Sequence, residues 1–583
     1  MEAARKDIAV MALAAGTVPM LLALNLLPSV TVPNQCAALI LWGAWTLVLA
    51  PARLPRAAWP LVAALALVAA GALWSTTVAS LPASLGLSAL GVLAGALLLA
   101  WTGANAARRA DGAAVFGWFA DGLLLAGLVS ALIAMLQVFA PEFGAAGLIA
   151  RSHIAGRAIG NLRQPNLLCS LLQWALVAIV LRLERGRMPA LPAWGAAAAM
   201  VFAIELSGSR TGAVGLVLLA LWGALDRRLG RSSRRMLLAL PLLFALAFAA
   251  MALYGDWAHR TIGAATRLAD AGNIDNPNAR LNIWANALKM IAREPWAGVG
   301  FGEFNLAWTL TAFPDRPTAF FDHTHNLPLQ LAVELGLPLG GSVLVLLGLA
   351  LWRAWRRSRG AAGDDGVAAR ASWMMVVVIA FHSLVEYPLW YAQFLLPAAF
   401  AWGYALGVPG PREPTPGARS RWAGIASALA LIAGGAYGLA DYVRIAEIYR
   451  PGLSAASLEP RIVRGQRSMF FAHHADYAAA LAGRPGAASD LGFERAIHNL
   501  LGSWLMMAWA RHLADADQGE LARALAARLR EFRSPDTADF FARCEPSSSP
   551  DAGAGKAGPP FQCQAARLEH GWREFVRAAA TER

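Results

Sequence analysis

Hydrophobic segments of membrane-spanning length dominate this chain. Of its 583 residues, 57% are hydrophobic and only 15% are charged, which is too apolar for a soluble protein of this length. A helix needs about 20 apolar residues to cross a bilayer, so we expect an all-α, polytopic integral membrane protein with about 12–13 transmembrane helices. Thirteen segments reach or approach that length: 8–28, 35–51, 58–77, 81–101, 114–140, 166–183, 190–206, 210–225, 236–255, 326–352, 371–387, 390–408 and 421–440.

The arginines between these segments predict the orientation of the chain. Basic residues gather before the first segment and after the second, fourth, sixth, eighth, tenth and twelfth, all on one side of the membrane. By the positive-inside rule that side is cytoplasmic. We therefore expect a transmembrane domain over residues 1–440, in the inner membrane of a Gram-negative cell, with its N-terminus in the cytoplasm. Residues 441–583 would then form a C-terminal domain in the periplasm.

Three arginines on the predicted outer side indicate the chemistry of a ligand. Arg163 and Arg210 stand at segment edges, and Arg280 lies in the large outer loop 256–325. Long loops cross the membrane regardless of charge, which accounts for other arginines of the same loop. Because arginine suits bidentate phosphate recognition, the three predict a phosphate-bearing, lipid-linked ligand. The net charge of +13 does not indicate nucleic acid, because no aromatic-basic motif accompanies it.

A short polar stretch, Phe321 to Asn326, directly precedes the hydrophobic run of the tenth segment. Two histidines and an asparagine at a membrane boundary usually face a cavity and mark a functional site. The alternative is that the stretch only caps a helix, with Asp322 or Thr324 as the N-cap and Pro328 in the first turn. Capping alone leaves both histidines unexplained.

The polar residues predicted on the outer side fit a transferase with a lipid pyrophosphate donor. Histidine is the usual base near neutral pH, and His325 and His323 are the candidates. Arginines stabilise a departing pyrophosphate without a metal. No acidic pair or DxD motif stands nearby, so we expect no metal and no cofactor. Zinc bound by both histidines and Asp322 is a weaker alternative, because such close positions do not readily give tetrahedral geometry.

The C-terminal part of the chain is polar and helical in pattern. Residues 494–532 predict two amphipathic helices separated at Gln518-Gly519. Cys544 and Cys563 flank a segment rich in Ser, Pro, Gly and Ala, which predicts a flexible loop. In an oxidising compartment these two cysteines are expected to form a disulfide.

Five motifs give the chain a resemblance to a known family. They are Gly160–Asn166 (GNLRQPN), Ser209–Gly212 (SRTG), Arg280 with Trp284, His323–Asn326 (HTHN) and Glu386–Tyr391 (EYPLWY). Over residues 140–410 the sequence resembles the O-antigen ligase and polymerase superfamily, and most closely its bacterial protein O-oligosaccharyltransferases, or pilin glycosylation ligases. The resemblance implies a GT-C-like membrane fold.

The resemblance also implies roles for individual residues. His325 matches the family's essential histidine, and His323 would be its neighbour. Arg210 and Arg280 match its arginines, with Arg163 as a third pyrophosphate ligand. Substrate or support roles fall to residues of the same motifs: Gln164, Asn166, Asn326, Glu386 and Tyr387.

The implied reaction is transfer of a whole oligosaccharide from undecaprenyl pyrophosphate to a Ser or Thr of a pilin or another periplasmic protein, with inversion. Two alternatives use the same chemistry: an O-antigen ligase that transfers to lipid A-core, and an O-antigen polymerase. A transporter is a third alternative. It is disfavoured because no inverted repeat is evident and the polar groups gather at one face rather than at the midplane.

Overall fold

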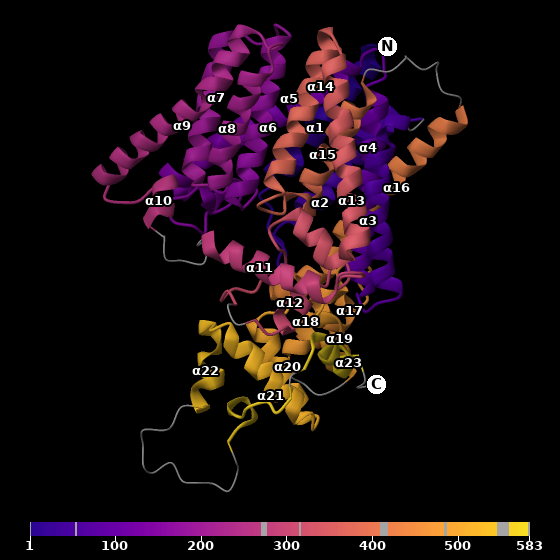
Figure 1. The fold of residues 1–583 in the computed structure, drawn as a ribbon, viewed down its shortest axis with the longest axis vertical. Coiled ribbons are helices and arrows are strands. Elements are labelled where there is room, and N and C mark those ends of the chain that lie inside the picture. Colours follow the sequence, from indigo (N-terminus) through magenta and orange to yellow (C-terminus); the bar gives the residue numbers. More distant parts are fainter. Residues whose placement is uncertain are drawn as a thin grey trace. The chain divides into compact units, whose positions relative to one another are not determined.

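All regular structure in the described part of the chain is helical in the computed structural model (Figure 1). The chain packs into two compact units. Unit 1 comprises Met1–Val68, Gly91–Ala271 and Val343–Leu439, and unit 2 comprises Ala69–Leu90, Gly272–Ser342 and Ala440–Arg583. The structure describes residues 2–52, 55–269, 277–313, 316–408, 418–482, 487–544, 559–568 and 570–580.

Each of the thirteen predicted segments overlaps a helix, although the bounds differ by several residues. Within the described residues, ten helices are long and apolar enough to cross a membrane, which confirms the expected all-α, polytopic architecture. Three others fall short: α1 carries charges at its start, and α8 and α15 have 16 residues each. The thirteen are α1 (Glu2–Leu21), α2 (Val32–Leu49), α3 (Trp59–Thr77), α4 (Ala83–Ala106), α5 (Gly112–Phe139), α6 (Pro165–Glu184), α7 (Ala190–Ser207), α8 (Arg210–Leu225), α9 (Arg231–Trp257), α13 (Leu327–Gly360), α14 (Gly363–His382), α15 (Ala392–Gly407) and α16 (Ala418–Tyr449).

Helix α6 is the centre of unit 1. It packs against α5, α7 and α14, and α8 packs against α9 (Figure 1). The helix is buried along nearly its whole length. This is expected because apolar residues cover every face of it. Its first turn carries Asn166, so the packing of α6 fixes the position of that predicted site residue.

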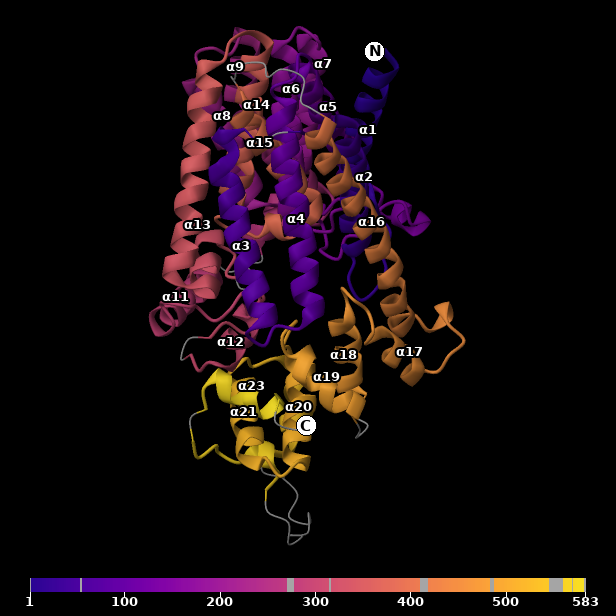
Figure 2. The ribbon, with the colours of Figure 1, turned by 90° about the vertical axis from the view of Figure 1, so that its right-hand side faces the viewer.

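Unit 2 contains the C-terminal helices and the part of the predicted outer loop from Gly272 onward. The loop includes two helices in this unit, α11 (Pro277–Arg293) and α12 (Phe304–Leu310), and α12 packs against α21 and α23 (Figure 2). The two amphipathic helices predicted within residues 494–532 are confirmed as α20 and α21. The helices of the C-terminal part are α17 (Leu458–Gly465), α18 (Ala472–Leu481), α19 (Ala487–Ala496), α20 (Ser503–Asp515), α21 (Gly519–Glu531), α22 (Ala538–Phe541) and α23 (Trp572–Ala580).

Helix α13 is broken at Gly336, which the hydrophobic pattern did not reveal. Gly336 has φ 73° and ψ 169°, a conformation that favours glycine. The backbone N–H of Leu337 donates to the carbonyl of Pro295 at 2.8 Å. A Cβ at Gly336 would lie 2.3 Å from the carbonyl oxygen of Trp296. Residues 327–335 therefore form a separate short helix after the histidines.

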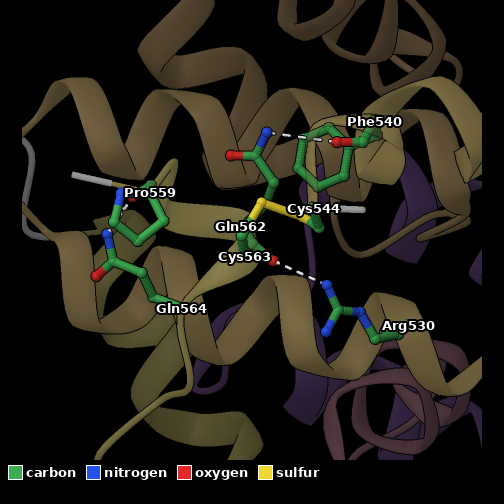
Figure 3. Close-up of a disulfide and its surroundings, with 7 residues drawn as sticks. All are labelled: Arg530, Phe540, Cys544, Pro559, Gln562, Cys563 and Gln564. Carbon is green, nitrogen blue, oxygen red and sulfur yellow. Dashed lines mark hydrogen bonds between the residues drawn. A yellow bond between two sulfur atoms is a disulfide. The ribbon is translucent and has the colours of Figure 1, made fainter. Parts of the chain in front are cut away.

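Cys544 and Cys563 are joined by a disulfide (Figure 3). Their Cα atoms lie 5.1 Å apart and their sequence separation is 19. Next to the bond, the side-chain amide of Gln562 donates to the carbonyl of Phe540 at 3.3 Å, and Arg530 donates to the carbonyl of Gln562 at 3.2 Å. The predicted flexible loop between the cysteines lies outside the described residues over positions 545–558.

We expect this disulfide to form in cells and to stabilise the C-terminal helices. Closing a loop of this length contributes about 3 kcal/mol to the free energy of unfolding, so Cys544→Ser with Cys563→Ser should lower it by that amount. Non-reducing peptide mapping checks the bond itself. The buried free cysteines Cys36 and Cys169 serve as internal references that should remain thiols. Finding Cys544 and Cys563 equally reduced would contradict the prediction.

Candidate functional site

The histidine loop, defined here as residues 321–326, has an unusual backbone at His325. The φ angle of His325 is 54°, in the left-handed region that non-glycine residues seldom adopt. Its ring meets the ring of Phe321 edge to face, with centroids 5.7 Å apart. Residues in such conformations persist only where the surrounding structure holds them. They are found more often at active sites than elsewhere. The side chain remains partly exposed, so the imidazole is accessible to a substrate.

His323 lies beside a carboxylate. Its Nδ1 is 2.8 Å from Oδ1 of Asp322, and only 11% of the His323 side chain is exposed. Burial raises the pKa of Asp322, but the charge of His323 and its hydrogen bond outweigh that effect and leave the pKa below its ordinary value. Asp322 is therefore a carboxylate that orients the His323 ring. This arrangement fits the predicted role of His323 as a neighbour of the base.

Two side chains hold the backbone at the centre of the histidine loop. The N–H of Thr324 donates to Oε1 of Gln330 at 2.7 Å, and the indole N–H of Trp284 donates to the carbonyl of Thr324 at 2.9 Å. Arg280 precedes Trp284 by four residues on α11, so the two side chains share one face of that helix. The helix that carries the predicted pyrophosphate ligand Arg280 thus also holds the histidine loop.

Asn326 caps the helix that follows the histidine loop. Its side-chain oxygen accepts a hydrogen bond from the N–H of Leu329 at 3.0 Å. The capping alternative that named Asp322 or Thr324 is therefore wrong about the residue. Asp322 contacts His323, and the hydroxyl of Thr324 donates to the carbonyl of Asn326 at 2.8 Å. Capping by Asn326 fixes the end of the histidine loop without using either imidazole as the cap.

Unit 1 contains a second cluster of predicted site residues. Asn166 donates to Oε1 of Glu386 at 2.8 Å and accepts from the hydroxyl of Ser209 at 2.5 Å. Ser209 also accepts from the N–H of Gly212 at 3.0 Å and so caps α8. The structure thus joins three motifs that lie far apart in the sequence. Arg210 is the exposed first residue of α8, where the helix dipole also favours an anion.

Arg163 and Gln164 have structural partners in the loop before α6. Arg163 donates to the carbonyl of Val30 at 3.0 Å and to that of Ala23, and its φ is 58°. The side chain of Gln164 caps α6 by accepting from the N–H of Leu167 at 2.6 Å. These bonds shape the loop. The phosphate role of Arg163 and the substrate role of Gln164 stay predictions.

The turn that carries Glu386 also includes a histidine that the sequence analysis missed. His382 is buried at the end of α14, bonded through Nδ1 to the hydroxyl of Ser170, and its carbonyl accepts from the N–H of Glu386 at 2.9 Å. A lone histidine in an apolar segment was the available signal. Tyr387 stacks on Tyr391 with ring centroids 6.2 Å apart, and its predicted substrate role stays a prediction.

In unit 2 the sequence analysis missed a buried acid–histidine pair and an asparagine. Nδ1 of His498 lies 2.8 Å from both carboxylate oxygens of Glu303, and each side chain is only 2% exposed. Asn305, two residues further, contacts the histidine loop itself. Glu303 and His498 are 195 residues apart in sequence, so no local pattern links them. Among the described residues, no group of three His, Cys, Asp or Glu side chains is placed to hold a metal ion.

Comparisons with known families agree with the membrane fold. Residues 195–344 match the O-antigen ligase family, a span that contains Arg210, Arg280 and the histidine loop. Residues 371–530 match the family described as virulence factor membrane-bound polymerase, C-terminal, and residues 158–183 match the protein glycosylation ligase family. Together with the apolar helices, these matches make the chain a multi-pass membrane protein.

Two curated relatives from Acinetobacter baylyi are similar to this chain. A general O-oligosaccharyltransferase is 29% identical over 292 residues, which cover 48% of this chain and 49% of the relative. A ComP-specific O-oligosaccharyltransferase is 24% identical over 262 residues, covering 43% and 44%. The chain thus spans about half the length of each relative. These matches confirm the resemblance to bacterial protein O-oligosaccharyltransferases of the O-antigen ligase superfamily.

Proposed function

We propose that this protein transfers a whole oligosaccharide from undecaprenyl pyrophosphate to a Ser or Thr of a periplasmic protein, a pilin being one such acceptor. The conformation of His325 carries the proposal. A left-handed histidine, packed against Phe321 in a loop whose backbone is held by the buried Gln330, supports a preorganised base at the start of an apolar helix.

The proposed reaction is a single displacement. The neutral imidazole of His325 accepts the proton of the acceptor hydroxyl as its oxygen attacks the anomeric carbon of the first sugar. The bond from that carbon to the pyrophosphate oxygen breaks, and the pyrophosphate keeps the electron pair. Because attack and departure occur on opposite faces, the anomeric configuration inverts. His323, oriented by Asp322, supports the loop beside the base.

Arginines take the charge of the leaving group in this proposal. Arg280, on the face of α11 that carries Trp284, is assigned to the pyrophosphate. Arg210 is also assigned to a phosphate group. It is the first residue of α8, whose start is fixed by Ser209 and Asn166. Glu386 positions Asn166, and Arg163 and Gln164 shape the preceding loop.

The acceptor class rests on the match to the protein glycosylation ligase family and on the similarity to two O-oligosaccharyltransferases. The polymerase match over residues 371–530 supports the second candidate, in which the acceptor is another lipid-linked glycan. Both candidates share the donor and the base, so they differ only in the hydroxyl that attacks.

Co-expression with a defined lipid-linked glycan tests the proposal. The host would carry a candidate pilin and lack its own ligase, and mass spectrometry would read the pilin, the lipid A-core and the lipid-linked glycan. A pilin that gains the intact oligosaccharide supports the proposal. Glycan on lipid A-core, or a lengthened lipid-linked glycan, would replace it with the ligase or the polymerase. No product on any acceptor would end the transferase assignment.

We further propose that the C-terminal part and the histidine loop face the periplasm. Alkaline phosphatase, which is active only outside the cytoplasm, should be active when fused after Arg450, just beyond α16, and inactive when fused after Gly360, at the end of α13. The reversed pattern of activities would contradict the periplasmic assignment of the site.

A further inference from the structure

The role of the C-terminal helices can be inferred from one side chain in unit 2. Asn305 is only 3% exposed, and its amide is shared between two segments. Its side-chain N–H donates to the carbonyl of Phe321 at 2.9 Å. Its side-chain oxygen accepts from the N–H of Leu501, just before α20, at 2.7 Å. One amide therefore connects the C-terminal part of the chain to the first residue of the histidine loop.

The contact with Phe321 leads to the base. The ring of Phe321 meets the ring of His325 edge to face, and it also packs edge to face on Trp308, with centroids 5.6 Å apart. Asn305 holds the backbone of Phe321, and Trp308 packs on its ring, so together they limit how far that ring can move from His325. The orientation of the imidazole thus depends on a bond that Asn305 makes.

Aromatic and ionic contacts strengthen the same connection. Phe320 stacks on Phe532, from the end of α21, with ring centroids 3.9 Å apart. Arg316, whose side chain is 1% exposed, donates to Glu531 at 3.1 Å and lies over the ring of Phe532. The segment that leads into the histidine loop is therefore fixed on the C-terminal helices at several points.

We propose that Asn305 is a positioning residue through which the C-terminal helices set the orientation of His325. It acts through the backbone of Phe321 and is assigned no contact with the substrate. This inference rests on the proposed function for its kinetic consequence, but the contacts themselves do not depend on it. The contact between the C-terminal helices and Asn305 would then be needed for catalysis and not only for folding.

Asn305→Asp separates the two bonds of the amide. A carboxylate still accepts from the N–H of Leu501 but cannot donate to Phe321. In purified full-length protein, hydrogen–deuterium exchange over residues 320–331 should become about tenfold faster, while peptides around Leu501 keep their protection. The kcat should fall roughly 10–100-fold with KM for the lipid-linked donor nearly unchanged, because misplacing a reacting group costs rate rather than binding. Asn305→Ala should expose both regions to exchange.

Asn105→Asp is the matched control. Asn105 also bridges two backbone groups, accepting from the N–H of Ala52 at 3.2 Å and donating to the carbonyl of Trp101 at 2.9 Å, but it belongs to unit 1. Its variant should leave exchange over residues 320–331 and kcat as in the wild type. If Asn305→Asp is not recovered folded, the smaller and uncharged Asn305→Ser, whose side chain is too short to bridge both partners, tests whether losing the bridge speeds exchange over residues 320–331 and lowers kcat.

Two results would overturn the inference. One is unchanged exchange of the histidine loop in Asn305→Asp and Asn305→Ser, which would make Asn305 merely structural whatever the enzyme does. The other is faster exchange with unchanged kcat, which would remove the link to His325. A wild-type protein that transfers no glycan would instead count against the proposed function, and the exchange measurement would still test the connection.

Discussion

His325→Ala is expected to abolish glycan transfer while the protein remains folded and still binds its donor. Loss of a general base alone reduces the rate by about 10²–10⁴-fold, which reads as inactivity in a cellular assay. His323→Ala should only weaken transfer, because His323 pairs with Asp322 and supports the loop. Mass spectrometry of the acceptor, with protein levels checked in parallel, measures both.

The left-handed backbone of His325 makes a sharper control necessary. At a φ of 54°, alanine is strained by roughly 1–2 kcal/mol, so His325→Ala could lose activity through the loop rather than through the base. Asparagine adopts this conformation more readily than other residues but is no base. His325→Asn should therefore be as inactive as His325→Ala. An active His325→Asn beside an inactive His325→Ala would show that the backbone, and not the imidazole, is what the reaction needs.

Replacing Arg210 or Arg280 by lysine is expected to reduce transfer nearly as much as replacement by alanine. Lysine keeps the positive charge but loses the planar fork that binds two phosphate oxygens at once. Loss of one such contact in the transition state is worth roughly 2–4 kcal/mol, or about 10²–10³ in rate. Initial rates with saturating lipid-linked donor measure the effect.

Two arginines in similar settings serve as controls for these substitutions. Arg293 is exposed at the end of α11, the helix of Arg280, and Arg231 is the exposed first residue of α9, as Arg210 is of α8. Lysine at either control position should leave transfer unchanged. Near-normal rates with lysine at Arg210 and Arg280 would mean that charge alone suffices.

The fold followed from the sequence because a bilayer restricts the possible structures so strongly. Lipid offers backbone groups no hydrogen-bond partners, so an apolar run of sufficient length must be helical. All thirteen predicted segments are accordingly helices. The break at Gly336 escaped prediction because it results from the close approach of Trp296, a contact that hydropathy does not measure.

The candidate site was predictable only where chemistry is visible in single residues. The histidines and arginines stood out because polar groups are unexpected at membrane boundaries. Asn305 and the pair of Glu303 with His498 did not, because Asn305 bonds to Leu501 and Glu303 to His498, 196 and 195 residues away in the chain. Likewise, no pattern could tell that Asn326 rather than Thr324 would cap the helix. Such choices depend on which neighbours tertiary packing supplies.

The bonds among Asn166, Ser209 and Glu386 limit how relatives of this chain can exchange segments. A hybrid that takes the EYPLWY turn from one parent and the first turn of α6 from another changes the neighbours of a carboxylate that is only 6% exposed. Leaving a buried charged group poorly matched costs several kcal/mol. Chimeras intended to alter glycan or acceptor preference should therefore inherit the three motifs as one block, with their junctions placed outside α6, α8 and the turn after α14.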